Sequence, residues 1–380
     1  MAGSGAPAVT PAEFFPSIAL VRAAAALLVI YDHFLGVWPE HNNIQWVPAM
    51  IVDRWFFTPL QLMQHGGALA VAMFFMVSGF IIVHVGMRES PRAFAIRRAL
   101  RIYPPLWVSM VALLVAYGIA LHVSDADLGG YSVSIALRES NPLPHILAAA
   151  TLGNYLIGTP PINGVAWTLI IEVLFYVSVF LLLPLLKKRP RVGIVVAFAV
   201  LGLSQIVAKA GVVIFLTAVN LVFVTYLFLG TLVYLRWAKR IGSGFFVVAT
   251  AAFWGLFLWG LAKLVIQPPW TLAGYGVSYA FAWFVFVTLL LVDRHIRLDP
   301  ITAFFSRISY SLYLNHGGLG ILALTLLYPR IGYPASLAFA FAAVVAISAA
   351  SYRWVELPSQ RLARRLTARA VAEPKPSPEA

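Results

Sequence analysis

The sequence contains no cysteine and very few charged residues. Without thiols there is no disulfide, no zinc–thiolate site and no cysteine nucleophile. Only 11% of the 380 residues are charged, whereas 61% are hydrophobic and the mean hydropathy is +0.87. This balance lies far outside the range of soluble domains. The chain is therefore predicted to be an integral membrane protein with no separate soluble domain.

The net charge of +13 does not indicate a nucleic-acid partner. The basic residues stand in short runs between apolar segments, and no basic patch with interleaved aromatic residues accompanies them. Membrane topology explains such runs better, because cytoplasmic loops are enriched in lysine and arginine. The expected surroundings of the chain are therefore membrane lipids, with no nucleic acid.

Apolar stretches long enough to cross a bilayer recur along the chain. The predicted fold class is all-α, a polytopic transmembrane helical bundle of about ten spans. The spans are expected near residues 17–38, 65–87, 103–122, 165–186, 191–208, 212–235, 244–263, 270–292, 301–327 and 334–355. With these spans, 20 of the 27 lysines and arginines fall in connections on one side, which predicts that this side and both termini are cytoplasmic.

Three segments make up the predicted domain organisation. Residues 1–16 are expected to be a cytoplasmic N-terminal segment, and residues 17–355 the transmembrane domain. The first apolar run is long and lacks a clear A-x-A cleavage site, so we expect it to be retained as a span. Residues 356–380 are expected to begin as a basic amphipathic helix at the inner leaflet and to end as a disordered, proline-rich stub.

The first predicted span contains an arginine and a histidine, Arg22 and His33. An ionisable group at the centre of a span costs about 2.5 to 3.5 kcal/mol, so both should face the protein interior or water. On a regular helix they lie on nearly one face, about 16 Å apart. Asp32 points about 100° away from His33, so it should pair with the ring only if the helix ends or unwinds there. For Arg22, structural pairing fits the pattern as well as a chemical role.

Two further spans contain polar stripes at helical spacing. The span at 165–186 contains a carboxylate that needs a partner, Glu172. If its stripe faces the first span, Glu172 can orient the His33 ring and stabilise the imidazolium formed on proton uptake. The span at 301–327 brings a hydroxyl, a phenol and an imidazole to one face: Ser309, Tyr313 and His316.

The connection PRAFAIRRALRIYPPLW, residues 91–107, contains an arginine pair. Arg98 and Arg101 are one helical turn apart, and a Pro-Pro break is expected after them. The positive-inside rule accounts for such a run by itself. The alternative is a clamp for an anionic ligand, because paired guanidinium groups match phosphate oxygens bidentately. A site for a phosphate-bearing ligand on the cytoplasmic side, combined with a basic histidine toward the outer side of the membrane, suits an acyl donor that enters from the cytoplasm.

Six stretches of the chain, in this order, resemble the acyltransferase-3 family of membrane acyltransferases, which includes bacterial O-acetylases of polysaccharides, nodulation factors and macrolides. The stretches are RAAAALLVIYDHF (22–34), FFMVSGFII (74–82), RRALRIYPPLW (97–107), WTLIIEVLFY (167–176), ISYSLYLNH (308–316) and YRWVELP (352–358). No single stretch is specific, but together they run through most of the chain in the order and spacing of the family.

The resemblance implies an enzyme that takes an acyl group, commonly acetyl, from cytoplasmic acyl-CoA and transfers it to a hydroxyl at or beyond the outer side of the membrane. His33 occupies the position of the family's essential histidine. Arg98 and Arg101 match its R-x-x-R pair, which is linked to the donor, and Glu172 matches the glutamate of its W-S/T-L-x-x-E-x-x-F-Y stretch. The other matching positions are Arg22, Ser78, Tyr310, Tyr313 and His316.

Two departures from the family pattern matter. Asp32 stands where an aliphatic or aromatic residue is more usual, next to the expected catalytic histidine. No SGNH-type esterase domain follows the bundle in this sequence, so we expect transfer without a relay between two domains.

The expected mechanism uses these residues in order. CoA phosphates dock on Arg98 and Arg101, pantetheine passes along the Arg22 side of the first span, and His33 acts as general base on the acceptor hydroxyl. An acyl-histidine intermediate is the variant mechanism. The substrate or the oxyanion is expected to contact Ser78, Tyr310, Tyr313 or His316. No metal is expected.

The acceptor is expected to be a glycan, as an exopolysaccharide or a lipid-linked sugar, or else a small hydroxylated metabolite such as a macrolide. A proton-coupled transporter or flippase is the rival class, because His, Glu and Arg inside spans also form proton relays. A non-catalytic membrane scaffold is the third class of function considered. The absence of a visible internal repeat favours an enzyme. The expected location is the bacterial cytoplasmic (inner) membrane, and the oligomeric state is left open, a homo-oligomer included.

Overall fold

The computed structural model describes residues 15–123, 128, 132–138, 141–266 and 271–368. Over this part of the chain the fold is all-α and contains no strand, which confirms the predicted class. Residues 1–14 of the predicted N-terminal segment lie outside the described residues. So do residues 369–380, which include the predicted proline-rich stub.

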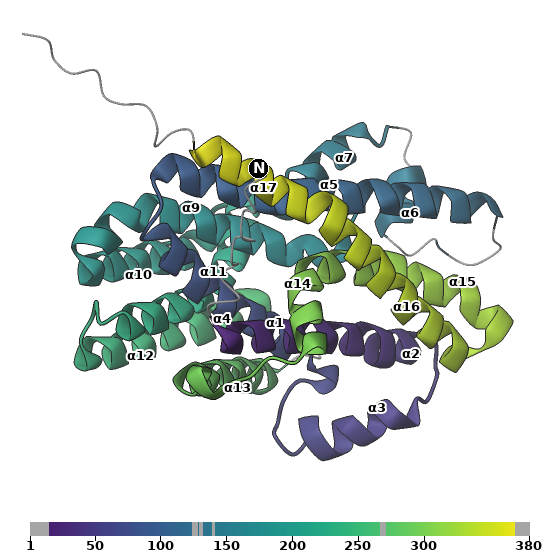
Figure 1. The fold of residues 1–380 in the computed structure, drawn as a ribbon, viewed down its shortest axis with the longest axis horizontal. Coiled ribbons are helices and arrows are strands. Elements are labelled where there is room, and N and C mark those ends of the chain that lie inside the picture. Colours follow the sequence, from purple (N-terminus) through teal and green to yellow (C-terminus); the bar gives the residue numbers. More distant parts are fainter. Residues whose placement is uncertain (1–14, 124–127, 129–131, 139–140, 267–270, 369–380) are drawn as a thin grey trace, which may run out of the picture. The chain divides into compact units, whose positions relative to one another are not determined.

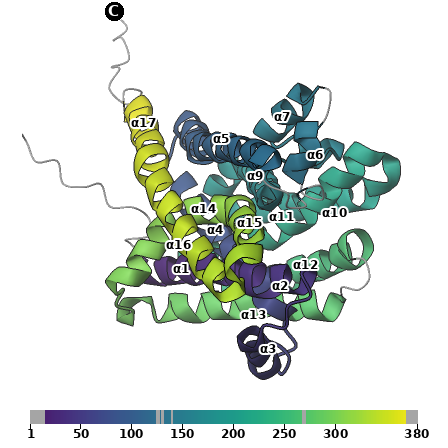
Figure 2. The ribbon, with the colours of Figure 1, turned by 90° about the vertical axis from the view of Figure 1, so that its right-hand side faces the viewer.

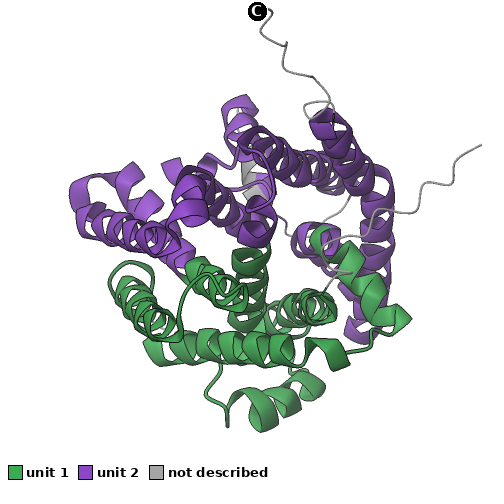
Figure 3. Ribbon diagram, turned by 60° about the vertical axis from the view of Figure 1, so that its left-hand side comes forward, with its two compact units in different colours: residues 1–81, 226–310 green, residues 82–225, 311–380 purple. Residues whose placement is uncertain are grey.

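The chain forms two compact units, and each combines two separate parts of the sequence (Figure 3). Unit 1 contains residues 1–81 and 226–310, and unit 2 contains residues 82–225 and 311–380. Three helices have residues in both units: α4 (Gly67–Gly86), α11 (Val212–Trp237) and α14 (Pro300–Asn315) (Figure 1).

The other elements belong to one unit each. Those of unit 1 are α1 (Pro16–Ile30), η2 (Tyr31–Val37), α2 (Trp38–His41), α3 (Val47–Val52), η3 (Asp53–Phe57), η4 (Gln64–Gly66), α12 (Ser243–Gly260), η7 (Leu261–Val265), α13 (Leu272–Leu291) and η8 (Asp293–His295). Those of unit 2 are α5 (Pro91–Val123), α6 (Ser132–Arg138), α7 (Leu143–Ala150), α8 (Asn154–Ile157), η5 (Gly164–Ala166), α9 (Trp167–Lys188), α10 (Pro190–Ile206), η6 (Val207–Ala210), η9 (His316–Gly320), α15 (Ile321–Ile331), α16 (Tyr333–Ser351), η10 (Tyr352–Glu356) and α17 (Leu357–Ala368).

Nine helical segments of the described residues are long and apolar enough to cross a membrane. They are Pro16–His41, Gln64–Gly86, Pro91–Val123, Gly164–Lys188, Pro190–Ala210, Val212–Trp237, Ser243–Val265, Leu272–Leu291 and Tyr333–Ala368. The expected span at 301–327 is not among them, although α14, the π-helical η9 and α15 follow one another there. Its polar side chains reduce its hydropathy: Ser309, Tyr310, Ser311, Asn315 and His316.

Helix α5 is longer than the sequence predicts. The expected Pro-Pro break is wrong, because the helix continues through Pro104 and Pro105. The two prolines lack an N–H, so the carbonyls of Leu100 and Arg101 lose their usual helical donors. Membrane helices tolerate such prolines where neighbouring groups take over the freed carbonyls. The basic connection is therefore the beginning of a long helix and not a loop.

The first span is not a regular α-helix throughout. Helix α1 passes into the π-helical η2, which contains His33, and then into α2. The expectation that Arg22 and His33 share one face assumed 3.6 residues per turn, and this premise fails beyond α1. π-Helical turns are rare and frequently lie at functional sites.

Two glycines let α4 and α11 pack closely within unit 1. A Cβ on Gly230 would lie 2.7 Å from Met76 O and 3.0 Å from the Cα of Gly79. A Cβ on Gly79 would overlap the carbonyl of Leu227. Thr231 Oγ1 donates to Gly79 O at 3.1 Å. Small residues allow membrane helices to approach closely, so the glycine of FFMVSGFII has a packing role.

In unit 2 the C-terminal helix α17 lies along α5 (Figures 1 and 2). Its buried face repeats every four residues: Ser359, Ala363 and Thr367. Thr367 Oγ1 accepts a hydrogen bond from Arg97 Nε at 3.0 Å. Just before α17, the buried Glu356 accepts from Ser311 Oγ at 3.0 Å. The tail therefore begins as the predicted helix, and its small-residue face packs on the helix that contains the arginine pair.

Replacing Gly79 or Gly230 with alanine is expected to destabilise the protein by about 1 to 3 kcal/mol, because the new Cβ overlaps backbone atoms that cannot move away. Gly255→Ala is the matched control, since this glycine also lies inside a helix and its Cβ would meet no described atom within 4 Å. The control should gain up to about 1 kcal/mol from helix propensity. Thermal unfolding in detergent measures all three, and equal melting temperatures would contradict the close crossing.

Candidate active site

The predicted site residues form one group in each unit. Unit 1 contains Arg22, His33, Ser78 and Tyr310. Unit 2 contains Arg98, Arg101, Glu172, Tyr313 and His316.

His33 lies on the π-helical η2 beside Asp32. Its Nε2 is 3.9 Å from Asp32 Oδ2, and the two side chains are 29% and 15% exposed. The contact lies on the π-helical turn. The sequence made this pairing conditional on the helix ending or unwinding here, but the helix continues through η2 into α2 and the two side chains are in contact nonetheless. The carboxylate is placed to orient the ring and to stabilise charge that forms on proton uptake.

Arg22 binds the hydroxyl of Ser309, one of the three polar residues predicted to share a face of the span at 301–327. Its Nε and Nη2 donate to Ser309 Oγ at 3.2 and 2.8 Å. Ser309 Oγ donates in turn to Ser306 O at 2.9 Å. Ser78 is partly buried on α4, and Tyr310 is buried on α14. The sequence predicted that Ser309 lies on a polar helix face. It did not predict that Ser309 binds Arg22, which lies 287 positions away.

The sequence reasoning missed a histidine next to the turn that contains His33. His65 is buried in η4, with its Nδ1 2.8 Å from Asp53 Oδ2 and its Nε2 2.9 Å from Glu40 Oε1. Its ring packs so closely on Gly36 of η2 that a Cβ there would overlap it. The acids precede His65 by 12 and 25 positions, so no helical spacing reveals the cluster. The only sequence signal is that one connection contains several ionisable residues.

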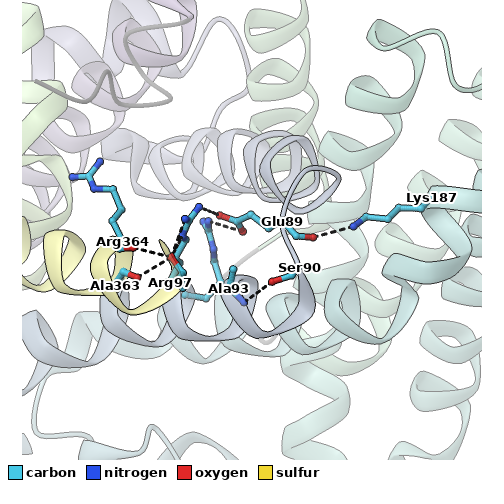
Figure 4. A network of polar contacts seen from close by, with 9 residues as sticks. Glu89, Ser90, Ala93, Arg97, Lys187, Ala363 and Arg364 are labelled. Carbon is cyan, nitrogen blue, oxygen red and sulfur yellow. Dashed lines mark hydrogen bonds and ion pairs between the residues drawn. The ribbon is translucent and has the colours of Figure 1, made fainter. Parts of the chain in front are cut away.

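In unit 2, two arginines of α5 pair with the buried carboxylate of Glu89 (Figure 4). Arg97 Nη1 is 2.8 Å from Oε1, and Arg98 Nη2 is 3.5 Å from Oε2. Lys187 Nζ donates to the backbone carbonyl of Glu89 at 3.0 Å. A buried carboxylate requires such partners, because desolvation without them is costly. Glu89 thus anchors the arginine-bearing end of α5, a role that the sequence analysis did not assign.

A proline and an N-cap serine place Glu89 at the start of α5. Ser90 Oγ accepts from the backbone N–H of Ala93 at 3.2 Å, and Pro91 occupies the first helical position. Glu89 therefore lies next to the positive end of the helix dipole, which favours a carboxylate. The sequence contained a signal for this role of Glu89, because Glu89 is the single acidic residue between residues 87 and 107, among several arginines.

Arg98 and Arg101 lie near the Tyr176–Glu172 pair of α9. The Tyr176 hydroxyl donates to Glu172 Oε1, and both arginines are electrostatic neighbours of this tyrosine. Arg98 is 9% exposed, and its Cζ lies 5.5 Å from the ring centre of Phe94. Its Nε has no hydrogen-bond partner among the described residues. The structure therefore brings Arg98, Arg101 and Glu172 together around one phenol.

A cavity of about 260 Å³ opens between α5 and α9 beside Arg98. Its polar groups come from Arg98, Tyr103 and Tyr176, and the rest of its wall is apolar. Val177, which is exposed, forms part of this wall. A mostly apolar cavity with a few polar groups is the usual form of a small-molecule site.

The expected contact of Glu172 with His33 joins residues of different units and stays a prediction. Thr168, one helical turn before Glu172 on α9, donates to the Tyr313 hydroxyl at 2.9 Å. That hydroxyl donates its one proton to Val165 O at 2.7 Å. For Tyr313 to donate to an oxyanion, this bond must first break.

His316 is completely buried at the start of the π-helical η9. Its Nδ1 is 2.7 Å from Tyr313 O, and a carbonyl only accepts, so Nδ1 carries a proton. In the neutral ring, Nε2 is then a hydrogen-bond acceptor. Nε2 can donate a hydrogen bond to an oxyanion only when the ring is protonated to the imidazolium. The next two residues, Gly317 and Gly318, lie so close to Val165 and Leu113 that side chains would overlap.

The comparisons with known proteins agree with these motifs. A family model described as an acyltransferase domain matches residues 15–353. Nodulation protein 10 of Rhizobium leguminosarum bv. viciae is 27% identical over 372 residues, which cover 92% of this chain and 94% of that protein. The exopolysaccharide production protein ExoZ of Rhizobium meliloti (strain 1021) is 28% identical over 326 residues, which cover 80% and 93%. No solved structure matches significantly. With every predicted site residue inside the matched region, this chain belongs to the acyltransferase-3 family of membrane acyltransferases.

Proposed function

We propose that this protein is a membrane O-acyltransferase that moves an acyl group, acetyl, from acyl-CoA at the cytoplasmic side to a hydroxyl of a glycan at the outer side. The observation that carries the proposal is the family match over residues 15–353. The names of the two relatives, a nodulation protein and an exopolysaccharide production protein, support a glycan as acceptor.

The arginine-bearing end of α5 supports an anionic donor such as CoA. This cluster combines four cationic side chains with two carboxylates: Arg97, Arg98, Arg101 and Lys187 with Glu89 and Glu172. The cluster therefore contains more positive than negative groups, and phosphates are the anions that guanidinium pairs bind bidentately. By the positive-inside rule this end of unit 2 faces the cytoplasm, where acyl-CoA is present.

His33 is the proposed general base. Its Nε2 side faces Asp32, so Nδ1 takes the proton of the acceptor hydroxyl as the oxygen attacks the thioester carbonyl. The tetrahedral intermediate then expels the CoA thiolate, which receives that proton, and the acyl ester remains on the acceptor. Glu172 either orients His33, as the sequence predicts, or holds Tyr176 beside the arginines, which its contact in unit 2 supports. Arg22 lines the donor path in this proposal, and Ser78, Tyr310, Tyr313 and His316 are the candidate contacts of the substrate or oxyanion.

His33→Ala is expected to reduce acyl transfer by about 10²- to 10⁴-fold, the usual contribution of a general base. The assay mixes purified protein, acetyl-CoA and exopolysaccharide from a strain that lacks this protein, and a thiol reagent measures the CoA released. Because the chain contains no cysteine, the reagent reports CoA alone. His295→Ala, at an exposed histidine of η8, is the control and should retain full activity. Equal activity of the two variants would refute the assignment of His33.

Arg98→Ala and Arg101→Ala are each expected to raise the KM for acetyl-CoA about tenfold or more, because a charge-assisted hydrogen bond contributes about 1.5 to 3 kcal/mol. Arg92→Ala removes an exposed arginine from the same helix and should leave this KM within twofold. The measurement is the CoA-release rate as a function of acetyl-CoA concentration. If all three variants behave alike, the general surface charge and not a specific clamp attracts the donor.

A further inference from the structure

His65 has a backbone conformation that needs support from its surroundings. Its φ is 59°, in the left-handed region that residues with a side chain rarely adopt. Its backbone N–H donates to Asp53 Oδ1 at 3.1 Å, and its Nδ1 lies 2.8 Å from the other oxygen of the same carboxylate. Such strained positions persist where several contacts hold them, and they cluster at functional sites.

Both ring nitrogens of His65 face carboxylates. Nδ1 faces Asp53 of η3, and Nε2 faces Glu40 of α2 at 2.9 Å. The Nε2 contact with Glu40 is a hydrogen bond, whereas the Nδ1 contact with Asp53 is a close approach without hydrogen-bond geometry. The side chain of Glu40 is 63% exposed, whereas those of His65 and Asp53 are 10% and 14% exposed. The cluster thus consists of one histidine and two carboxylates, and of these three side chains Glu40 is the exposed one.

The His65 ring packs directly on the turn that contains His33. A Cβ on Gly36 would lie 2.6 Å from both Cβ and Cδ2 of His65, and closer still to Cγ. Two residues after His65, a Cβ on Gly67 would overlap the Asp32 carboxylate. The residues from 65 to 67 therefore contact the π-helical η2 on both sides of His33 in the sequence, at Asp32 and at Gly36.

We propose that His65 is a positioning residue: held by Asp53 and Glu40, it packs on Gly36 and keeps the π-helical turn in the form that directs His33 into the reaction. This inference rests on the proposed role of His33 as general base. Because an α-helical turn would point His33 in another direction, loss of this contact should impair catalysis more than donor binding.

The test compares His65→Ala, His65→Gln, Gly36→Ala and the double variant Gly36→Ala/His65→Ala in the full-length protein. The first readout is the accessibility of His33, measured by diethyl pyrocarbonate modification and mass spectrometry, with exposed His295 as internal control. His65→Ala and Gly36→Ala are expected to change the modification rate of His33 severalfold and to leave that of His295 unchanged. His65→Gln, which retains a donor for one carboxylate, should have an intermediate effect.

The second readout is CoA release with acetyl-CoA and the exopolysaccharide acceptor. Each single alanine variant is expected to lower kcat about tenfold, with the KM for acetyl-CoA within twofold of the wild type. The double variant should lose less than the product of the two single losses, because removing the ring removes the overlap with Cγ and Cδ2, although the overlap with the Cβ of residue 65 remains. If His65→Ala does not fold, His65→Gln and Gly36→Ala carry the comparison.

Two results would overturn the inference: an unchanged modification rate of His33 in the variants, or a double variant whose loss equals the product of the single losses. Failure of the proposed function looks different. In that case His33→Ala retains acyl transfer, while the modification of His33 still reports whether His65 holds the turn.

Discussion

The cost of placing charge inside a membrane determines how the polar groups of this protein are arranged. Each ionised group removed from water must gain a partner, or it destabilises the fold by several kcal/mol. Glu89 gains two arginines, Arg22 gains the hydroxyl of Ser309, and His65 gains two carboxylates. These pairs hold segments that lie far apart in the sequence against one another.

Irregular helix geometry accompanies several motifs that this chain shares with the acyltransferase-3 family. Three of the π-helical segments in the described residues overlap the stretches that resemble the acyltransferase-3 family: η2 with YDHF, η9 with the end of YSLYLNH, and η10 with YRWVE. Asp32 and His33 are in contact on η2. The glycines of η2 and η9 lie against side chains of other elements: Gly36 against His65, Gly317 against Val165 and Gly318 against Leu113. These π-helical segments are therefore closely packed on their neighbours.

The predictions about helix geometry differ in outcome. Prolines at 104 and 105 suggested a break, but α5 continues through them because a helix in a membrane has few alternatives to hydrogen-bonded backbone. The common face of Arg22 and His33 was predicted from a constant 3.6-residue turn, which holds through α1 and not in η2, and it stays a prediction. The stripe on α9 was predicted well, since Glu172 and Tyr176 are four residues apart and make a local contact.

The sequence by itself determined the fold class, the approximate positions of the spans and the family, because hydropathy and motif order depend on residues close together in the chain. Only the tertiary structure decided which polar side chains pair with one another. Arg22 and Ser309 are 287 positions apart, Arg97 and Thr367 are 270 apart, and His65 binds acids from two other elements. Desolvation requires that each such group find a partner, but which partner is near depends on how helices distant in the sequence pack against one another.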